Sequence, residues 1–444
     1  MVKPVILEAP WREPLAVLSA FADEPWTCAF LSGGGGQRAR WSYVMRDPEA
    51  VTTLAPGNPR DAFATLAAMV GPPVETDPDG PPFQGGVAGL AAYELGDRVE
   101  ALGLARHADW PDLSLGLYPR LLAFDHVERC VLAIGPDAAQ AKACAHWLTK
   151  RGREGFEGVL AETFAAETPA ASYEAAVADV VSRIEDGEIF QANIARTWSG
   201  RLAAGAGPFD VLARLAGSSP APFAAYLRLP ERAVVSNSPE RFVSVTTGAE
   251  FLVETRPIKG TRPRGATAVD DAALAAELSA SAKDRAENLM IVDLMRNDLA
   301  RVSPPGSVVT PELFRVESFV NVHHLVSTVT SRLAPGMTAA DLLRAAFPPG
   351  SITGAPKVQA MKVIAGLEGP RGPYCGSLFW AGFDGAFDSS VLIRTLGLVQ
   401  DEAGWRFEAK AGAGIVADSD PRSERLETED KIAAIRRALS EAPA

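Results

Sequence analysis

Strand-like runs in this sequence come in clusters, and long helical patterns separate the clusters. In the second half of the chain, the runs lie at 189–198, 223–229, 233–236, 241–246, 250–255, 390–399 and 405–411. The helical patterns lie at 282–302, 356–367 and 421–439, and the segment 316–333 is strand-like in its second half. Clustered strands do not fit strict β-α-β alternation. They favour sheets that are covered by helices on the outside.

Residues 1–165 have a mixed α/β pattern with many turn signals. We expect strands at 87–93, 115–124 and 130–134, a helix at 138–151, and loops at 33–36 and 72–82. The loop at 33–36 is not a phosphate loop, because no Gly-Lys-Ser/Thr follows its glycines. The charged, irregular stretch 151–168 is the expected boundary. After it, Ser172 is the expected N-cap of a helix that Gly187 closes.

The stretch 254–261 reads Glu-Thr-Arg-Pro-Ile-Lys-Gly-Thr and follows the end of a strand. Pro257 stops regular strand pairing, because proline has no N–H to donate. Gly260 permits a backbone turn that a larger residue would resist. We therefore expect Lys259 on a tight turn. Its amine could be a nucleophile, a proton donor or an anion-binding group, or it could simply face solvent.

Two of the helical patterns each carry two carboxylates three residues apart. Asp284 and Glu287 lie in the first, and Glu424 and Glu427 lie in the second. This spacing places both members of a pair on one face of the helix. Oxygen ligands on rigid helices suit Mg²⁺, although such pairs are also common on solvated helix faces. The spacing does not say whether the two helices meet.

Three further features are candidates for anion or proton chemistry. Gly412-Ala-Gly414 follows a strand and could offer backbone N–H groups to an anion, or form an ordinary turn. Arg394 lies within the apolar run 390–399, so its charge needs either an ion pair or a bound carboxylate. His323 and His324 fall between apolar residues, and one of them is expected to be a core histidine.

Composition limits the possible partners. The chain has 43 basic and 55 acidic residues and no run of Lys or Arg, which argues against a nucleic-acid partner. Its four cysteines form no metal-binding spacing and no disulfide framework. The first residues lack the apolar core of a signal peptide, and no apolar run has membrane-spanning length. We therefore expect a cytoplasmic protein with reduced thiols and no membrane partner.

A series of ordered motifs resembles the chorismate-utilising enzyme family. This family includes anthranilate synthase component I, aminodeoxychorismate synthase component I, isochorismate synthase and salicylate synthase. The resemblance covers about 172–440 and, more weakly, 85–94 and 115–127. Its motifs are Gln191-Ala-Asn193, Ser238-Pro-Glu-Arg-Phe242, Arg256-Pro-Ile-Lys-Gly-Thr261, the segment 284–298, Val322-His-His-Leu-Val326, the segment 347–357, Ile393-Arg-Thr395, Ala411-Gly-Ala-Gly414 and the helix with Glu424, Glu427 and Lys431.

The resemblance implies an α/β (α+β) fold like that of anthranilate synthase component I, a sandwich of two packed β-sheets flanked by outer helices. Residues 1–165 would form the N-terminal α/β region of this fold, and residues 166–444 would form the chorismate-binding catalytic region. The implied cofactor is Mg²⁺. Its ligands would be Asp284, Glu287, Glu424 and Glu427.

The resemblance also implies roles for individual side chains. Glu240 would protonate the leaving C4 hydroxyl of chorismate, with His324 beside it, and Lys259 would be the nucleophile. The substrate-binding residues would be Gln191, Thr261, Thr353, Tyr374, Arg394, Gly412, Gly414 and Lys431. To attack, the Lys259 amine must be neutral, so burial or a nearby cation must lower its pKa. Arg256, Arg262 and the metal are the candidate cations.

Two positions bear on the branch of the family. Isochorismate and salicylate synthases have a lysine base where this chain has Gln191, which implies that ammonia rather than water is the nucleophile. Anthranilate synthases have alanine at the centre of Pro-Ile-x-Gly-Thr, whereas aminodeoxychorismate synthases have lysine, as here at Lys259. This implies conversion of chorismate to 4-amino-4-deoxychorismate, for p-aminobenzoate and folate. A separate glutamine amidotransferase subunit, component II, would supply the ammonia.

Some features depart from the family pattern. Phe379-Trp380 stands where the family usually has Gly-Tyr, and we expect it to narrow the substrate pocket or reshape the partner surface. The Leu-Leu-Glu-Ser signature of tryptophan-regulated members is absent. The alternatives are anthranilate synthase component I, a 2-amino-2-deoxyisochorismate synthase, and an inactive chorismate-binding regulatory subunit. The presence of Lys259, Glu240 and all four carboxylates argues against the last.

Overall fold

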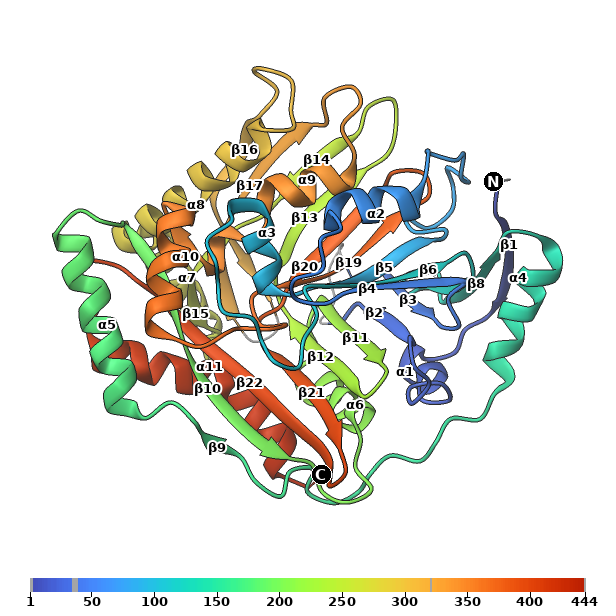
Figure 1. Ribbon diagram of the computed structural model, residues 1–444, viewed down its shortest axis with the longest axis horizontal. Helices are drawn as coiled ribbons and strands as arrows, with labels where there is room; N and C mark the ends of the chain where they lie inside the picture. Colours follow the sequence, from blue (N-terminus) through green and yellow to red (C-terminus); the bar gives the residue numbers. More distant parts are fainter. Residues whose placement is uncertain (1–2, 34–38, 320–321, 443–444) are drawn as a thin grey trace.

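The computed structural model describes residues 3–33, 39–319 and 322–442, and their strands form two large antiparallel sheets (Figure 1). In spatial order, the twelve-stranded sheet contains β1 (Val5–Pro10), β8 (Cys130–Gly135), β7 (Leu121–Asp125), β3 (Trp41–Met45), β2 (Cys28–Leu31), β11 (Phe223–Leu229), β12 (Arg232–Ser238), β21 (Thr395–Asp401), β22 (Gly404–Ile415), β10 (Gln191–Arg201) and β18 (Gly354–Ala355), and β9 (Ala165–Ala166) pairs with β10.

The ten-stranded sheet lies against the first. In spatial order, it contains β15 (Ile258–Pro263), β17 (Val322–Arg332), β14 (Leu252–Thr255), β13 (Arg241–Thr246), β20 (Phe387–Val391), β19 (Ser377–Gly382), β5 (Gly86–Ala91), β6 (Leu113–Tyr118) and β4 (Ala50–Leu54), and β16 (Val309–Ser318) pairs with β17. Tyr43 of β3 and Trp380 of β19 pack together between the sheets, with ring centroids 6.1 Å apart.

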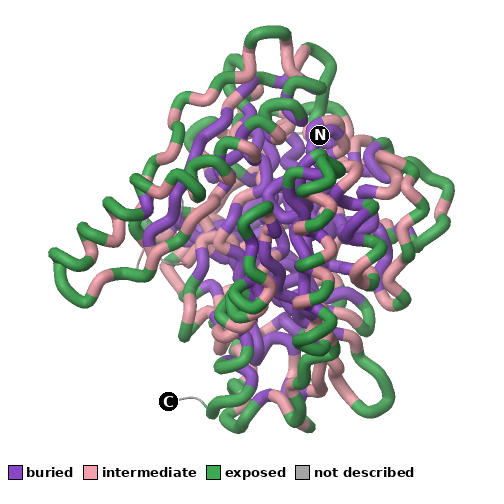
Figure 2. Tube along the Cα trace, turned by 90° about the vertical axis from the view of Figure 1, so that its left-hand side faces the viewer, coloured by how far each residue is buried: buried purple, intermediate pink, exposed green. Residues whose placement is uncertain are grey.

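Helices cover the outside of this sandwich, where the chain is most exposed (Figure 2). They are α1 (Pro14–Leu18), α2 (Ala62–Val70), α3 (Asp97–Glu100), α4 (Ala138–Ala145), α5 (Ala170–Glu185), α6 (Pro208–Ser218), α7 (Ala268–Ala280), α8 (Ala282–Ala300), α9 (Ala339–Ala346), α10 (Lys357–Leu367) and α11 (Pro421–Ser440). Val211, Leu212 and Leu215 share one face of α6, and this face is buried over the twelve-stranded sheet. None of the described helices is both long and apolar enough to cross a membrane. The predicted sandwich with outer helices is confirmed.

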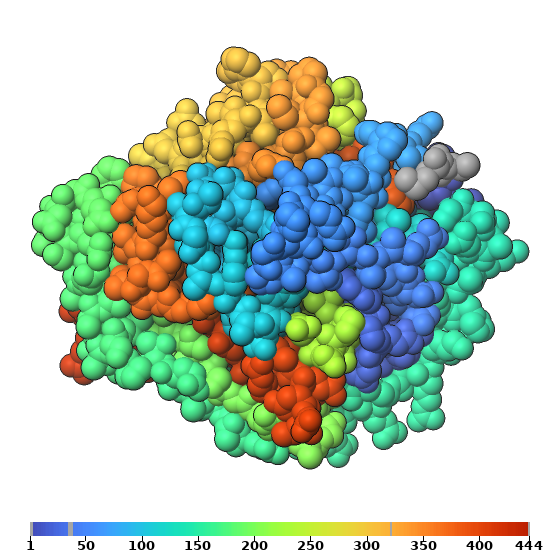
Figure 3. Space-filling model, in the orientation of Figure 1, coloured from blue at the N-terminus to red at the C-terminus, as the bar shows by residue number. Residues whose placement is uncertain are grey.

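Both sheets contain strands from before and after residue 165. In the twelve-stranded sheet, β2 pairs with β11, and in the ten-stranded sheet, β5 pairs with β19. The surface shows the same mixing, because blue and cyan segments lie directly against orange ones (Figure 3). Arg344 of α9 forms an ion pair of 2.5 Å with Asp61, the N-cap of α2. Residues 1–165 and 166–444 therefore contribute to the same hydrophobic cores.

Two predicted strands are wrong as single strands. The run 115–124 is divided at Pro119 into β6 and β7, and the run 390–399 is divided before Thr395 into β20 and β21. In each case, the two strands belong to different sheets. Pro119 cannot donate to a ladder, and Arg394 has a positive φ of 51° that turns the chain. A continuous apolar run does not reveal where the chain passes from one sheet to the other, because the strands on both sides of that point are buried.

Smaller differences concern element ends. Helix α5 begins directly after Pro169, so Ser172 lies in its first turn and is not the N-cap, while Gly187, with φ 76°, follows the end of the helix as expected. Helix α4 is shorter than predicted and continues as a 3₁₀ turn at His146–Thr149. Strand β16 was not predicted. Residues 34–36 of the predicted loop and residues 320–321 of the segment 316–333 lie outside the described residues.

Candidate active site

Lys259 of the ten-stranded sheet meets two residues of the twelve-stranded sheet. A Cβ atom placed on Gly414 of β22 would lie 2.9 Å from Gln191 Nε2 and 3.1 Å from Lys259 Nζ. Gln191 begins β10, which pairs with β22. Both amide atoms of Gln191 are buried without a hydrogen-bond partner in the described structure. Such atoms normally have partners, so this amide is available to a bound molecule.

The backbone places Lys259 within a strand, and the predicted tight turn is therefore wrong. Lys259 lies in β15 opposite Leu325 of β17, and the register shifts between Lys259 and Thr261. Gly260 occupies this bulge with φ 78°. A Cβ atom there would lie 2.8 Å from Cγ of Asp284, so the close approach of α8 also requires glycine.

The Lys259 amine has no ion pair or hydrogen bond within the described part of the chain. Burial lowers the pKa of Lys259, and the positive charge of Lys431 adds to this effect, whereas Glu287 opposes it. The two arginines expected to lower this pKa are not among its causes. Arg256 pairs with Glu317, and Arg262 pairs with Asp284 and Glu277. The amine therefore loses its proton more easily than that of an exposed lysine.

Glu240 is a buried carboxyl between β12 and β13. Its Oε1 accepts a hydrogen bond of 2.7 Å from Oγ of Ser351, in the motif 347–357. Burial raises the pKa of Glu240 to about 7, against the opposing effects of the Ser351 hydrogen bond and the Lys259 charge. A large fraction of this group therefore carries a proton near neutral pH, as a general acid requires.

His324 is a buried, neutral imidazole on β17. Its Nδ1 lies 2.9 Å from Oγ1 of Thr261, with which it shares a hydrogen bond. Burial and the nearby Arg394 charge lower the pKa of His324 to about 4. Its neighbour His323 is the expected core histidine, since its two ring nitrogens bond Ser318 and Asp271.

Arg394 lies between β20 and β21, where the chain changes sheet. Its guanidinium has no carboxylate within ion-pair distance in the described residues, and burial lowers the pKa of Arg394. The sequence left two explanations open for the Arg394 charge, an internal ion pair or a bound carboxylate. The ion pair is absent among the described residues. An uncompensated guanidinium in a half-buried place fits a bound anion.

Gly412 lies beside the hydroxyl of Tyr374. A Cβ atom on Gly412 would lie 3.0 Å from Tyr374 Oη and 2.6 Å from Asn193 Oδ1. Strand β21 pairs with β22 only as far as Ala409, so beyond it β22 has a neighbouring strand on the β10 side alone. Lys431 of α11 donates to the carbonyl oxygen of Gly412 at 2.9 Å. The predicted substrate-binding residues of β22 thus line an open end of the sheet.

The first turns of the two carboxylate-bearing helices lie near each other, which the spacing of their carboxylates could not decide. Lys283 at the start of α8 forms an ion pair of 3.2 Å with Asp418, just before α11. Burial raises the pKa of Glu287, and the neighbouring carboxylates Asp284 and Glu424 raise it further. Glu287 has no hydrogen bond or ion pair within the described residues.

The other three carboxylates have partners. Asp284 pairs with Arg262 at 3.0 Å, Glu424 accepts from Ser419 at 2.6 Å, and Glu427 pairs with Lys431 at 2.6 Å. No three Asp, Glu, His or Cys side chains of the described chain are close enough to hold a metal ion as they stand. The four carboxylates of α8 and α11 nevertheless suit Mg²⁺ chemically. They are hard oxygen donors, and a cation would relieve the repulsion between them.

The profile of a family described as chorismate binding enzyme matches residues 27–437. This chain belongs to the chorismate binding enzyme family. Aminodeoxychorismate synthase component 1 of Klebsiella aerogenes is 40% identical over 97% of this chain and 98% of its own. Anthranilate synthase component 1 of Thermus thermophilus is 38% identical over 92% of this chain and 89% of its own.

A solved structure supports the same fold for this chorismate binding enzyme. Anthranilate synthase component I from Streptococcus pneumoniae superposes with a TM-score of 0.78 at 29% identity, covering 90% of this chain and 93% of that chain. The predicted fold and the predicted family are both confirmed.

Sequence reasoning missed two polar residues of this site. Asn193 follows Gln191 at the strand period of two, so both lie on one face of β10, and its Oδ1 is buried without a partner in the described chain. The second residue is Ser351, which donates a hydrogen bond to the Glu240 carboxyl group. Asn193 and Ser351 both lie within the family motifs given above, 191–193 and 347–357, and their positions in these motifs could have indicated them. Thr353, in contrast, uses its hydroxyl to donate to Pro349 O at 2.8 Å.

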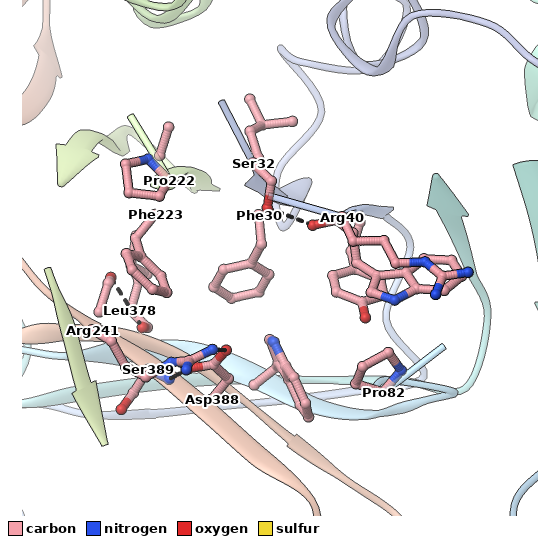
Figure 4. Close-up of a pocket in the computed structure, with 16 residues that line it drawn as sticks. Phe30, Ser32, Arg40, Pro82, Pro222, Phe223, Arg241, Leu378, Asp388 and Ser389 are labelled. Atoms are coloured by element: carbon pink, nitrogen blue, oxygen red, sulfur yellow. Dashed lines mark hydrogen bonds and ion pairs between the residues drawn. The ribbon is translucent and has the colours of Figure 1, made fainter. Parts of the chain in front are cut away.

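A cavity of about 250 Å³ lies between the sheets and is lined by none of the predicted site residues (Figure 4). Trp380 lines it together with Phe30 and Phe223, beside the ion pair of Arg241 and Asp388. Phe379 lies on the other face of β19, fully buried. The expectation that this pair reshapes a partner surface is wrong, because Trp380 is buried between the sheets and Phe379 is buried between the ten-stranded sheet and the outer helices.

Proposed function

We propose that this chain replaces the C4 hydroxyl of chorismate with ammonia, giving 4-amino-4-deoxychorismate and water. The proposal rests mainly on the surroundings of the Lys259 amine. This amine lies against Gln191 and Gly414, has no partner among the described residues, and has a pKa lowered first by burial. These are the properties of an amine prepared for nucleophilic attack.

The proposed reaction has two displacements. In the first, the Lys259 nitrogen bonds to ring C2, the double bonds shift, and the C4–O bond breaks as Glu240 gives its proton to the leaving hydroxyl, which departs as water. In the second, ammonia bonds to C4 and the C2–N bond breaks, which returns the lysine amine. The Glu240 carboxylate then takes a proton from the new ammonium group, so that both side chains regain their starting states.

Other side chains would hold the substrate. Arg394 and Tyr374 would bind the carboxylate of the enolpyruvyl group, and the free amide of Gln191 would contact the ring or the incoming ammonia. Neutral His324, fixed by Thr261, would orient the leaving hydroxyl. A Mg²⁺ ion held by the carboxylates of α8 and α11 would supply positive charge for the ring carboxylate.

Glu240→Gln should lower the amination rate about a hundredfold, because general acid catalysis contributes at least that much. In the unaltered enzyme, the protonated form of Glu240 is required, so the rate should fall as pH rises through about 7, the pKa of Glu240. The variant cannot titrate and should lose this limb of the pH–rate profile. An unchanged profile in Glu240→Gln would assign the limb to another group.

The nitrogen source provides the test of the proposed function. The purified chain should aminate chorismate with Mg²⁺ and a high concentration of ammonium, but not with glutamine, because no glutaminase nucleophile motif is found in the 444 residues. The relatives named component 1 support a separate amidotransferase subunit that would restore glutamine use. Product mass identifies the amination. Glutamine-dependent turnover by the pure chain would contradict this assignment.

Anthranilate synthesis is the second candidate, because a relative with that name is 38% identical. Amination at C2 with loss of pyruvate would give fluorescent anthranilate, and amination without that loss would give the 2-amino isomer. The presence of Lys259 at the centre of Pro-Ile-x-Gly-Thr favours C4 amination. A fluorescent product from the unaltered chain would favour the second candidate.

A further inference from the structure

Asn288 is a fully buried amide on α8, one residue after Glu287. Its Nδ2 donates to the carbonyl oxygens of Pro257 and Leu325, at 3.3 Å each. Its Oδ1 accepts a hydrogen bond from Oγ of Ser327. Both amide protons and the amide oxygen are therefore used inside the protein, and none remains for a substrate.

One carbonyl group directly precedes β15 and the other lies in β17, the two strands that carry Lys259 and His324. Pro257 lies two residues before Lys259, and Leu325 is the residue directly opposite Lys259 in the β15–β17 pair. Leu325 also follows His324 in the chain. One side chain thus connects α8, next to Glu287, with β17 and with the residue that directly precedes β15, close to Lys259.

Regular pairing at this point is incomplete on the β15 side, although Ser327 N donates to Pro257 O and β16 pairs with the other edge of β17. Pro257 has no N–H, and the ladder between β15 and β17 is interrupted by the bulge at Gly260. Asparagine supplies two donors and one acceptor on a short side chain. Aspartate of the same shape could not donate to either carbonyl, and alanine would leave two carbonyls and the Ser327 hydroxyl with fewer partners.

We propose that Asn288 is a positioning residue that fixes the Glu287 carboxylate relative to the Lys259 amine. It acts through the backbone of three segments and touches neither substrate nor metal. The proposal rests on the proposed roles of Lys259 and Glu287. Outer partners of metal ligands commonly affect metal affinity or activity by about 10–100-fold when they are removed.

The test compares Asn288→Ala and Ser327→Ala with Asn297→Ala, an exposed asparagine of the same helix. We measure steady-state kinetics with chorismate and ammonia, the Mg²⁺ concentration that gives half-maximal rate, and Mn²⁺ binding in the absence of substrate. For Asn288→Ala, we expect kcat to fall about tenfold and the Mg²⁺ midpoint and Mn²⁺ dissociation constant to rise about tenfold, with little change in the KM for chorismate. Ser327→Ala should change the same quantities less, and Asn297→Ala should match the unaltered protein.

A merely structural role would lower the melting temperature and leave the metal midpoint and the Mn²⁺ affinity of the folded protein unchanged, and that result would overturn the proposal. If Asn288→Ala does not fold, Ser327→Ala decides by the same measurements. If the unaltered chain forms no aminated product, the proposed function fails. Substrate-free Mn²⁺ binding then still decides whether Asn288 positions Glu287.

Discussion

Lys259→Arg should lower the rate of 4-amino-4-deoxychorismate formation as much as Lys259→Ala, by roughly a thousandfold or more. Arginine keeps the positive charge, but its guanidinium stays protonated and is not a nucleophile. Lys259 has neither an ion pair nor a hydrogen bond in the described chain, and burial, first among the causes, lowers its pKa. A lysine that served only as a charge would instead need a fully protonated amine.

Mass spectrometry can separate the two roles. Enzyme incubated with chorismate and no ammonia should gain a substrate-derived mass on the peptide that contains Lys259, and both variants should lack it. Lys362→Arg, at an exposed position on α10, is the matched control and should keep both the adduct and the rate. Slow anthranilate-type chemistry in the Lys259 variants would be consistent with direct attack by ammonia at C2. A Lys259→Arg enzyme with near-normal rate would leave the lysine with a purely electrostatic role.

Removal of divalent metal with EDTA should reduce amination about a thousandfold, and added Mg²⁺ should restore it, since a metal supplies several kcal/mol of charge stabilisation. Burial raises the pKa of Glu287, Lys259 and Lys283 lower it, and Asp284 and Glu424 raise it, so a cation would relieve the repulsion among these three carboxylates. Glu427→Gln should lose turnover while circular dichroism shows an unchanged fold. Full activity of this variant in metal-free buffer would contradict the metal assignment.

Local patterns predicted the two helices that carry the carboxylates, and motif order predicted the fold. Helices α8 and α11 follow from 3.6-residue periodicity and carry their carboxylate pairs as expected. The conformations of Lys259 and Arg394 could not be predicted in the same way. A bulge and a change of sheet depend on which strand lies opposite, and a short stretch of sequence does not contain that information.

The electrostatic surroundings of the site were also beyond local reasoning. Arg256 and Arg262 are near Lys259 in sequence, yet their charges are taken by acidic partners. The cation that acts on Lys259 is Lys431, which comes from the last helix. Ionisation depends on distances in space, so charges close in sequence are a poor guide to it.

The sharing of strands between the two halves of the chain affects the order in which the molecule can assemble. During synthesis the N-terminal strands emerge first, but β2 must wait for β11, and β5 must wait for β19, nearly 300 residues later. Contacts of such high sequence separation are slow to form, and strand edges stay open to other chains meanwhile. Strand β22 closes the gap between β21 and β10 near the end of synthesis. Because β22 carries Gly412 and Gly414, the candidate active site is among the last parts of the protein to form.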